Sequence, residues 1–492
     1  MRKNKKKIFM IASTCLCIIL AFLAFVTITN QSKMSSINKN NSNFIHSSIN
    51  DSKSNIEESN TNFTNTNSDS NSLSNSNIVT NTNSSSLSSS NKPSVSNKPT
   101  TSNKPTTSNK PTTSNKPSTS NKPSTNVTKP LTAAEKTEEA LKKMTLDEKI
   151  GQMLIVSVSG KSMTSNIQNM IKKYKPGGII LFADNLGNYQ TTINFISDMK
   201  KNSSIPLIVS VDQEGGRVQR LTSITGKKVT NIPAMSDVGK MEDENLAYSI
   251  GTVIAEELLA LGFNMDFAPV LDVAVPNAYI SSRSFSTDPQ IVSKIAISLS
   301  KGISSKGVIP VYKHFPGHGS TVADSHYELP LLSKTKAELY DVDLVPFQYA
   351  IQNDAKVIMI GHLAAPKITN DNLPASLSKT LITGLLKQEM GYKGLVITDS
   401  LQMKGITNHY SQKEIYEMAI NAGVDFLLMP ESAEKAINNI KASIKEGKIK
   451  ESKINESVRK ILMLKYSSMK TDNISINYLG SQAHQNIVDK VK

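Results

Sequence analysis

The sequence predicts a parallel α/β fold, a (β/α)8 or TIM-type barrel, and three observations support this. Eight short apolar runs recur between residues 150 and 429, with amphipathic stretches of helical length between them. Strands that alternate with helices form parallel sheets, and eight such units in about 340 residues fit the size of a barrel. No Gly-rich phosphate loop follows the first run, which disfavours the alternative, an open doubly wound sheet.

The predicted elements begin with a helix at 132–143. The predicted strands are 150–158, 178–182, 207–212, 265–272, 308–313, 357–362, 394–399 and 425–429. The predicted helices between them are 164–174, 189–202, 245–262, 289–307, 336–352, 379–390 and 411–422, and a helical stretch at 432–466 follows. These elements define a single folded domain at 131–470 and a C-terminal tail at 471–492.

An N-terminal segment at 1–29 has the composition of a membrane sequence. Five cations lie within residues 2–7, and residues 8–29 carry no charge. At 1.5 Å per residue this run reaches roughly 33 Å, enough to cross a bilayer core of roughly 30 Å. It is either a cleaved signal peptide or a transmembrane anchor, and its length, without a small-x-small cleavage site, favours the anchor. We expect an extracytoplasmic protein, membrane-anchored or secreted, with the basic end in the cytoplasm.

Residues 30–130 are predicted to form a disordered linker. Ser, Asn, Thr, Lys and Pro dominate, so little apolar surface offsets the entropy of ordering. Asn-Lys-Pro recurs with a period of six, at 91–93, 97–99, 103–105, 109–111, 115–117 and 121–123. Proline at every sixth position opposes helix and sheet, which indicates a solvated stalk. Attraction to an anionic cell wall is the less favoured alternative to an inert spacer.

The formal net charge of +15 does not indicate a nucleic-acid partner. Residues 1–29 supply +5 and the linker +6, which leaves +4 for the remaining chain. Both cysteines, Cys15 and Cys17, lie in the apolar run, so the domain has no disulfide and no cysteine nucleophile. His314 and His318 are four residues apart, but Pro316 between them opposes a helical metal-ligand pair. We expect no metal and no cofactor.

Polar residues collect where the predicted strands end. The third strand ends at Asp212, the fifth at Lys313 followed by His314, the sixth at His362 and the seventh at Asp399. A single charged residue at a strand end commonly just faces solvent, but a barrel brings these ends to one mouth, where barrel enzymes carry their active sites. Glycosidic bond cleavage needs a carboxylate and a proton donor in such a place.

Four strings resemble glycoside hydrolase family 3, and within it the bacterial β-N-acetylglucosaminidases, or β-hexosaminidases. They are VDQEGGRVQRL (211–221), RSFSTDP (283–289), KHFPGHGSTVADSH (313–326) and VITDSLQMKG (396–405), with smaller matches at MTLDEKIGQML (144–154) and PASLS (374–378). The resemblance covers roughly 131–470. It implies a retaining, two-step hydrolysis through a glycosyl-enzyme.

The resemblance implies three catalytic residues. Asp399 matches the nucleophile, although an Asp between strand and helix could instead be a helix N-cap. His326 matches a general acid/base, and Asp324 would orient its imidazole and stabilise the charged form. The structural alternative for Asp324 and His326 is an incidental charge pair on a surface loop.

The resemblance also implies a set of sugar-binding residues, namely Asp212, Arg220, Arg283, Lys313 and His314. Glu214 and Arg217 are expected to be structural, and Gly215 with Gly216 to permit a tight turn. Ser320 departs from the Asp of many relatives, and His362 and Met403 are further candidates for the pocket wall.

The implied function is an exo-acting β-N-acetylglucosaminidase that removes terminal GlcNAc from β-linked glycans, with peptidoglycan fragments such as muropeptides as substrates. We expect a monomer whose partners are this carbohydrate and, through residues 1–29, a membrane. Two enzymatic alternatives remain, a β-glucosidase and a glycoside phosphorylase. A non-catalytic cell-wall-binding protein is disfavoured, because Asp399, Asp324 and His326 are all present.

Overall fold

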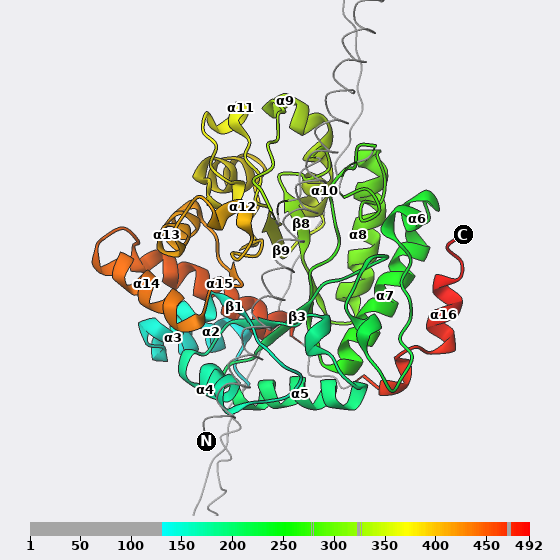
Figure 1. Ribbon diagram of the computed structural model, residues 1–492, viewed down its shortest axis with the longest axis horizontal. Coiled ribbons are helices and arrows are strands. Elements are labelled where there is room, and N and C mark those ends of the chain that lie inside the picture. Colours follow the sequence, from blue (N-terminus) through cyan, green and yellow to red (C-terminus); the bar gives the residue numbers. More distant parts are fainter. Residues whose placement is uncertain (1–129, 277, 279, 322–324, 326, 470–473) are drawn as a thin grey trace, which may run out of the picture. The chain divides into compact units, whose positions relative to one another are not determined.

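The computed structural model describes residues 130–276, 278, 280–321, 325, 327–469 and 474–492 (Figure 1). The predicted membrane segment and all but the last residue of the predicted linker lie outside these residues. In the described part, helices and strands alternate, and all pairings between its named strands except β4 with β5 are parallel. The predicted parallel α/β fold is therefore confirmed.

The strands are short and lie within or beside the predicted apolar runs. Their bounds are β1 Leu154–Ser157, β2 Gly178–Ile180, β3 Ile208–Val211, β4 Gln213–Gly215, β5 Val218–Gln219, β6 Met265–Asp266, β7 Ile309–Pro310, β8 Tyr312–Phe315, β9 Val357–Ile360, β10 Leu395–Thr398 and β11 Leu427–Leu428.

These strands form two parallel sheets and one antiparallel hairpin. The larger sheet has the order β11-β1-β2-β3-β6-β7, the smaller has the order β10-β9-β8, and β4 pairs with β5. The two sheets approach each other twice. Val311 alone separates β7 from β8 along the chain, and an isolated parallel bridge joins Ile397 of β10 to Phe426, next to β11.

The α-helices cover the sheets from outside (Figure 1). Their bounds are α2 Ala133–Lys143, α3 Leu146–Gln152, α4 Ser165–Tyr174, α5 Tyr189–Asn202, α6 Met235–Lys240, α7 Glu244–Leu261, α8 Pro289–Ser305, α9 Lys336–Glu338, α10 Val345–Gln352, α11 Pro366–Thr369, α12 Lys404–Thr407, α13 Gln412–Ala422, α14 Ala433–Lys445, α15 Glu451–Ser468 and α16 Gln482–Val488. Shorter 3-10 turns are Ala183–Asn185, Leu221–Ser223, Ala375–Leu377 and Ile476–Tyr478, and Leu339–Asp343 and Thr380–Glu389 are π-helical.

The first predicted strand was wrong at its beginning. Residues 150–152 belong to α3, because Thr145 caps that helix and Glu148 completes a capping box with the backbone of Thr145. Ile150 is therefore buried from a helix, and the strand itself begins at Leu154. An apolar run gave no sign of this boundary, since both elements bury the same kind of side chain.

The predicted strand at 265–272 was also too long. Only Met265 and Asp266 pair regularly, since Pro269 has no N–H to donate. The following residues pair irregularly with the segment around β8: Lys313 N donates to Pro269 O at 3.2 Å, and Leu271 N donates to Lys313 O at 2.6 Å. This irregular stretch brings Asp272 beside β8.

Several elements were not predicted at all. They are the hairpin β4–β5, which directly follows β3, the short helices α6, α11 and α12, and α16 in the segment predicted as a tail. The core is built from fully buried apolar side chains, for example Phe315 against Phe347, whose ring centroids lie 5.4 Å apart at 89°. None of the helices among the described residues has the length and apolar character needed to cross a bilayer.

Candidate active site

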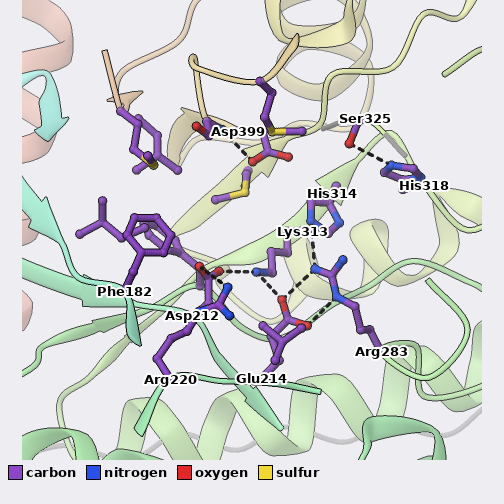
Figure 2. Close-up of a pocket in the computed structure, with 18 of the residues that line it drawn as sticks. Phe182, Asp212, Glu214, Arg220, Arg283, Lys313, His314, His318, Ser325 and Asp399 are labelled. Atoms are coloured by element: carbon purple, nitrogen blue, oxygen red, sulfur yellow. Dashed lines mark hydrogen bonds and ion pairs between the residues drawn. The ribbon is translucent and has the colours of Figure 1, made fainter. Parts of the chain in front are cut away.

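A cavity of about 350 Å³ lies where the parallel strands end. Small-ligand sites in proteins have volumes of this order. Its lining residues come from segments far apart in the chain and include Ile180, Phe182, Asp212, Glu214, Arg217, Val218, Arg220, Phe267, Arg283, Lys313, His314, His318, Ser325, Met359, Asp399, Ser400, Met403, Leu428 and Met429. Figure 2 shows Asp399 on one side of this cavity and a row of charged side chains on the other.

The charged row is centred on Lys313. Its Nζ lies 2.9 Å from Asp212 Oδ1 and 2.6 Å from Glu214 Oε1. Arg283 binds Glu214 with two hydrogen bonds, from Nε at 2.7 Å and from Nη2 at 2.8 Å. At the other end, Arg220 Nη2 lies 3.8 Å from Asp212 Oδ2. Each charged group is thus fixed by an opposite charge before any ligand arrives.

Ionisation follows from this pairing. Burial opposes the charge of Glu214, but Arg283 and Lys313 outweigh it and hold the pKa of that carboxyl far below its usual range. Burial likewise opposes the ammonium of Lys313, but Asp212 and Glu214 raise its pKa above the ordinary value. Both side chains are therefore charged at neutral pH. Lys313 carries three N–H donors, so one remains for a ligand after Asp212 and Glu214 have each accepted one hydrogen bond.

Asp399 follows β10 and is partly exposed where it lines the cavity. Its Oδ1 accepts a hydrogen bond from the backbone N–H of Ser400 at 2.7 Å. Burial opposes ionisation, yet the imidazoles of His362 and His314 and the Ser400 N–H lower the pKa of Asp399 below its usual value. The helix-cap alternative does not apply to α12, because the N-cap of that helix is Met403.

Of the two further candidates for the pocket wall, Met403 lines the cavity, whereas the buried His362 does not. Its Nε2 is 2.9 Å from the carbonyl oxygen of Ser400, and its Nδ1 is 2.7 Å from the Ser376 hydroxyl. Because a carbonyl only accepts, Nε2 carries a proton. His362 therefore holds the backbone that positions Asp399.

Asp272 was missed by the sequence reasoning. It is fully buried, and its Oδ2 accepts from His314 Nδ1 at 2.7 Å, while its Oδ1 accepts from the backbone N–H of His318 at 2.6 Å. The proton of His314 is thus on Nδ1, and its Nε2 lies 3.5 Å from Arg283 Nη2. Burial opposes the charge of Asp272, but His314 lowers its pKa. The available signal was its position: Asp272 ends the predicted run 265–272, as Asp212 and Asp399 end theirs.

Asp266, at the end of β6, is a second buried carboxyl that the sequence reasoning missed. Its Oδ1 accepts from the backbone N–H of Gln213 at 2.9 Å, which fixes the chain between Asp212 and Glu214. Burial raises the pKa of Asp266 well above its ordinary value. A neutral carboxyl at this position avoids a third negative charge beneath the row.

Asp324 and His326 lie outside the described residues, but Ser325 between them is described. Ser325 is buried and lines the cavity, and its hydroxyl lies 3.2 Å from Nε2 of His318. The hydroxyl of Thr321 contacts the other ring nitrogen of His318. The backbone at 325 is therefore held against the cavity that contains Asp399.

The remaining wall is apolar. Phe182, Met359, Met403 and Met429 line it, and the guanidinium carbon of Arg220 lies 6.0 Å from the centroid of the Phe182 ring. An apolar wall facing fixed polar groups is typical of small-ligand sites and suits a sugar ring, which has both C–H faces and hydroxyl edges. Among the described residues no cluster of three or more His, Cys, Asp or Glu could hold a metal ion.

The structure thus brings six of the eight predicted site residues together. Asp212, Arg220, Arg283, Lys313, His314 and Asp399 all line one cavity, and the other two lie outside the described residues. Glu214 and Arg217, which were expected to be structural, line it as well, and Glu214 is in addition the residue to which Lys313 and Arg283 are paired.

Comparisons with known proteins place the chain in a family. Residues 145–464 match the family described as Glycosyl hydrolase family 3 N terminal domain. A Beta-hexosaminidase of Nitrosospira multiformis is 35% identical over 291 residues, which are 57% of this chain and 82% of the relative. A Beta-hexosaminidase of Nitrosomonas eutropha is 33% identical over 297 residues, 58% of this chain and 84% of the relative.

Solved structures give the same result. A glycoside hydrolase family 3 beta-N-acetylglucosaminidase from a Paenibacillus species is similar with a TM-score of 0.66 and 31% identity, covering 71% of this chain and 68% of that chain. The structure of Beta-glucoside phosphorylase BglX bound to 2FGlc has a TM-score of 0.67 at 23% identity, covering 73% of this chain and 66% of that chain, which shows a shared fold alone.

Proposed function

Because this chain belongs to glycosyl hydrolase family 3, and is a glycoside hydrolase, we propose that it is an exo-acting, retaining β-N-acetylglucosaminidase. Its substrates would be glycans that end in β-linked GlcNAc, with peptidoglycan fragments as the natural class. The observation that carries the proposal is the placement of an ionised Asp399 in the same cavity as Asp212, Lys313 and His314.

In this proposal Asp399 is the nucleophile that attacks the anomeric carbon. Its lowered pKa keeps the carboxylate available, and the Ser400 N–H fixes one oxygen so that the other can face the substrate. The carboxylate of Asp212 accepts from two sugar hydroxyls, while Lys313 and Arg220 hold that carboxylate in place. Arg283 and His314 bind the ring substituents from the other end of the row.

Proton transfer is assigned to His326, with Asp324 as its orienting carboxylate. Retaining hydrolysis needs a group that protonates the leaving oxygen and then removes a proton from the attacking water. An imidazole can do both near neutral pH. The support is indirect: these residues flank Ser325, whose side chain lines the cavity.

We further propose that the two sheets are parts of one closed (β/α)8 barrel. Val311 joins β7 to β8 along the chain, and Phe426 N–H donates to Val396 O at 2.9 Å across the gap between β10 and β11. The two sheets contain six and three strands, and β7 with β8 counts as one continuous strand. Closing both gaps therefore gives eight parallel strand positions, with the cavity at their carboxyl ends. For the segment outside the described residues, the proposal is export: an anchor or signal at 8–29, and a stalk at 30–130.

The test is Asp399→Asn in the full chain, compared with wild type and with Asp237→Asn, a surface control from the exposed pair with Lys240. With 4-nitrophenyl β-GlcNAc we expect wild-type turnover, about 10³-fold or greater loss of kcat for Asp399→Asn, and no loss for the control. Early product detected as the β-anomer by NMR would support retention. Substantial turnover by Asp399→Asn would overturn the assignment of the nucleophile.

Two further arms separate the alternatives. The matched 4-nitrophenyl β-glucoside should be a poor substrate, and preference for it would make the protein a β-glucosidase. Inorganic phosphate added to the reaction should leave GlcNAc as the product, and formation of GlcNAc 1-phosphate would make it a phosphorylase.

A further inference from the structure

The C-terminal segment 474–492 lies beyond the residues that match the family, yet it is tied into the domain. Its helix α16 carries His484, which is buried and lies between two carboxylates of α7. His484 Nε2 is 2.8 Å from Glu256 Oε2, and its Nδ1 is 3.2 Å from Glu257 Oε1. The ring of Tyr478 stacks on His484 with centroids 5.8 Å apart. The segment is thus attached to α7 by charge and by ring contact.

Glu257 is the point where this segment meets a second part of the chain. Besides His484, its Oε1 accepts from the backbone N–H of Gly480 at 2.8 Å and from the hydroxyl of Thr230 at 2.5 Å. Gly480 has φ +61, and a Cβ there would lie 2.1 Å from the carbonyl oxygen of Lys228, so the segment packs directly on the loop that contains Thr230. One buried carboxylate therefore joins α16 to the loop 224–234.

The same loop holds the hairpin β4–β5. Ile232 N–H donates to Gln219 Oε1 at 2.8 Å, and Ile232 O accepts from the backbone N–H of Gly216 at 3.0 Å and from Gln219 Nε2 at 2.9 Å. At Gly215, which has φ +105, a Cβ would lie 2.5 Å from Pro233 O. The hairpin and the loop are in close backbone contact and cannot move independently.

The hairpin in turn forms one wall of the cavity. Glu214 lies in β4, Arg217 and Val218 at and after the turn, and Arg220 immediately after β5, and all four line the cavity. Arg220 also lies 3.8 Å from Asp212. A continuous series of sequence neighbours and hydrogen bonds therefore runs from α16, through Glu257, Thr230 and the loop, to this wall.

We propose that the C-terminal segment positions the β4–β5 wall of the substrate cavity, with His484 and Glu257 as positioning residues. The kinetic consequence rests on the proposed hydrolase function, whereas the positioning itself does not. Loss of the contact loosens a wall that binds the sugar and leaves Asp399 on a different segment untouched. The change therefore falls on substrate binding and not on the chemical step.

The charges around His484 explain why the contact holds. Lys306 Nζ lies 2.7 Å from Glu256 Oε1, so that carboxylate is paired on both sides, while Glu257 has His484 as its charged partner. Burial opposes the charge of His484, but its hydrogen bonds to Glu257 and Glu256 raise its pKa above the ordinary value. In its protonated form the imidazole donates to both carboxylates.

The experiment uses the full chain with two variants that cut the series on opposite sides of Glu257. His484→Ala removes the contact from α16, and Thr230→Val removes the loop hydroxyl while keeping the size of the side chain. Gln482→Ala is the matched control, because that side chain is exposed on α16 and bonds to Asn486 of the same helix. Each variant is assayed for KM and kcat on 4-nitrophenyl β-GlcNAc, and for amide hydrogen exchange in peptides that cover 213–234.

We expect His484→Ala and Thr230→Val each to raise KM about 3- to 10-fold with kcat within about twofold of wild type. Both should accelerate exchange at 213–234, and their combination should be less than additive because both act through Glu257. The control should change neither quantity. Unchanged KM and exchange in both variants, with only a lower unfolding temperature, would overturn the proposal and leave the segment a packing role.

The exchange measurement separates this inference from the proposed function. Should the wild-type protein lack glycosidase activity, faster exchange at 213–234 in both variants would still support positioning. Should activity be present and exchange unchanged, the positioning idea fails while the proposed function stands.

Discussion

Replacing Lys313 by methionine tests the central claim about the cavity, that its charged row is held by mutual pairing. Methionine keeps an unbranched side chain of similar length and removes the charge. In the wild type the Lys313 side chain is 3% exposed, and its ammonium lies within 3 Å of two carboxylates, at 2.9 Å from Asp212 and 2.6 Å from Glu214. After the change, Glu214 keeps Arg283 at 2.7 Å, whereas the ion pair left to Asp212 among the described residues is with Arg220 at 3.8 Å.

The expected loss follows from those distances. Breaking a buried ion pair by removing one partner costs about 3–5 kcal/mol, because the other charge stays buried and uncompensated. Since Glu214 retains Arg283, we expect the lower end, about 3 kcal/mol at pH 7. Lys240→Met is the matched control: Lys240 lies 2.8 Å from Asp237, but its side chain is 71% exposed. A pair of this kind contributes about 0–1 kcal/mol, so the comparison isolates burial at constant distance.

The stability difference between wild type and Lys313→Met should depend on pH. The folded pKa of Glu214 is depressed, so its contribution to stability is present above the unfolded carboxyl pKa of about 4.3 and is lost as the pH falls through the folded pKa. The pKa of Lys313 is raised, so its charge is constant below about pH 10.4. Without Lys313 the depression of Glu214 shrinks. The gap between wild type and Lys313→Met should therefore hold from pH 7 down to about pH 4 and narrow below it, where the carboxyl of the variant takes up a proton before that of the wild type.

The chain has no tryptophan, so guanidinium unfolding is followed by far-UV circular dichroism. A loss under about 1 kcal/mol at pH 7, the range of an exposed pair, would refute the pairing argument. So would a gap between wild type and Lys313→Met that widened as the pH fell below about 4.

Two further predictions concern Asp272 and His326. Asp272→Asn should lower stability by about 1–3 kcal/mol and reduce kcat/KM. The two oxygens of Asp272 accept from His314 Nδ1 and from the His318 N–H, whereas an amide has one oxygen and would turn its NH2 group toward one of these donors. Wild-type values for both stability and kcat/KM would contradict this. His326→Ala should lose about 10²–10⁴ in rate on a GlcNAc disaccharide and much less on the nitrophenyl glycoside, whose leaving group needs little protonation. Equal losses on the two substrates would point to a binding or structural role instead.

The sequence predicted the order of strands and helices well, because burial periodicity and capping residues are local signals. It failed where two elements share one signal. Ile150 is apolar whether it belongs to a strand or to α3, and only the capping box at Thr145 and Glu148 decides. It also failed at 267–272, where pairing partners from β8, remote in sequence, replace regular strand bonds. The helix α16 was missed because its burial depends on a distant partner, Glu257.

The site divides in the same way. Strand ends and motif strings identified Asp212, Lys313, His314 and Asp399, since the fold class alone brings strand ends together. Asp272 was within reach by the same rule. Glu214 was assigned a structural role, which is incomplete: the residue that fixes Lys313 and Arg283 also forms part of the wall. Structural and binding roles coincide when a pocket is lined by groups that pair with one another.

That coincidence bears on the kind of ligand the cavity accepts. Among the described residues its acids are Asp212, Glu214 and Asp399, and its Lys and Arg side chains are Lys313, Arg283, Arg220 and Arg217. Asp212 and Glu214 are paired with cations of the same cavity, so donors and acceptors point in fixed directions, which suits a hydroxyl-rich ligand. Lys313→Met would remove the ammonium that pairs with both carboxylates and leave Asp212 beside Arg220 at 3.8 Å. The stability loss and the loss of sugar affinity should therefore come from the same uncompensated carboxylate, Asp212.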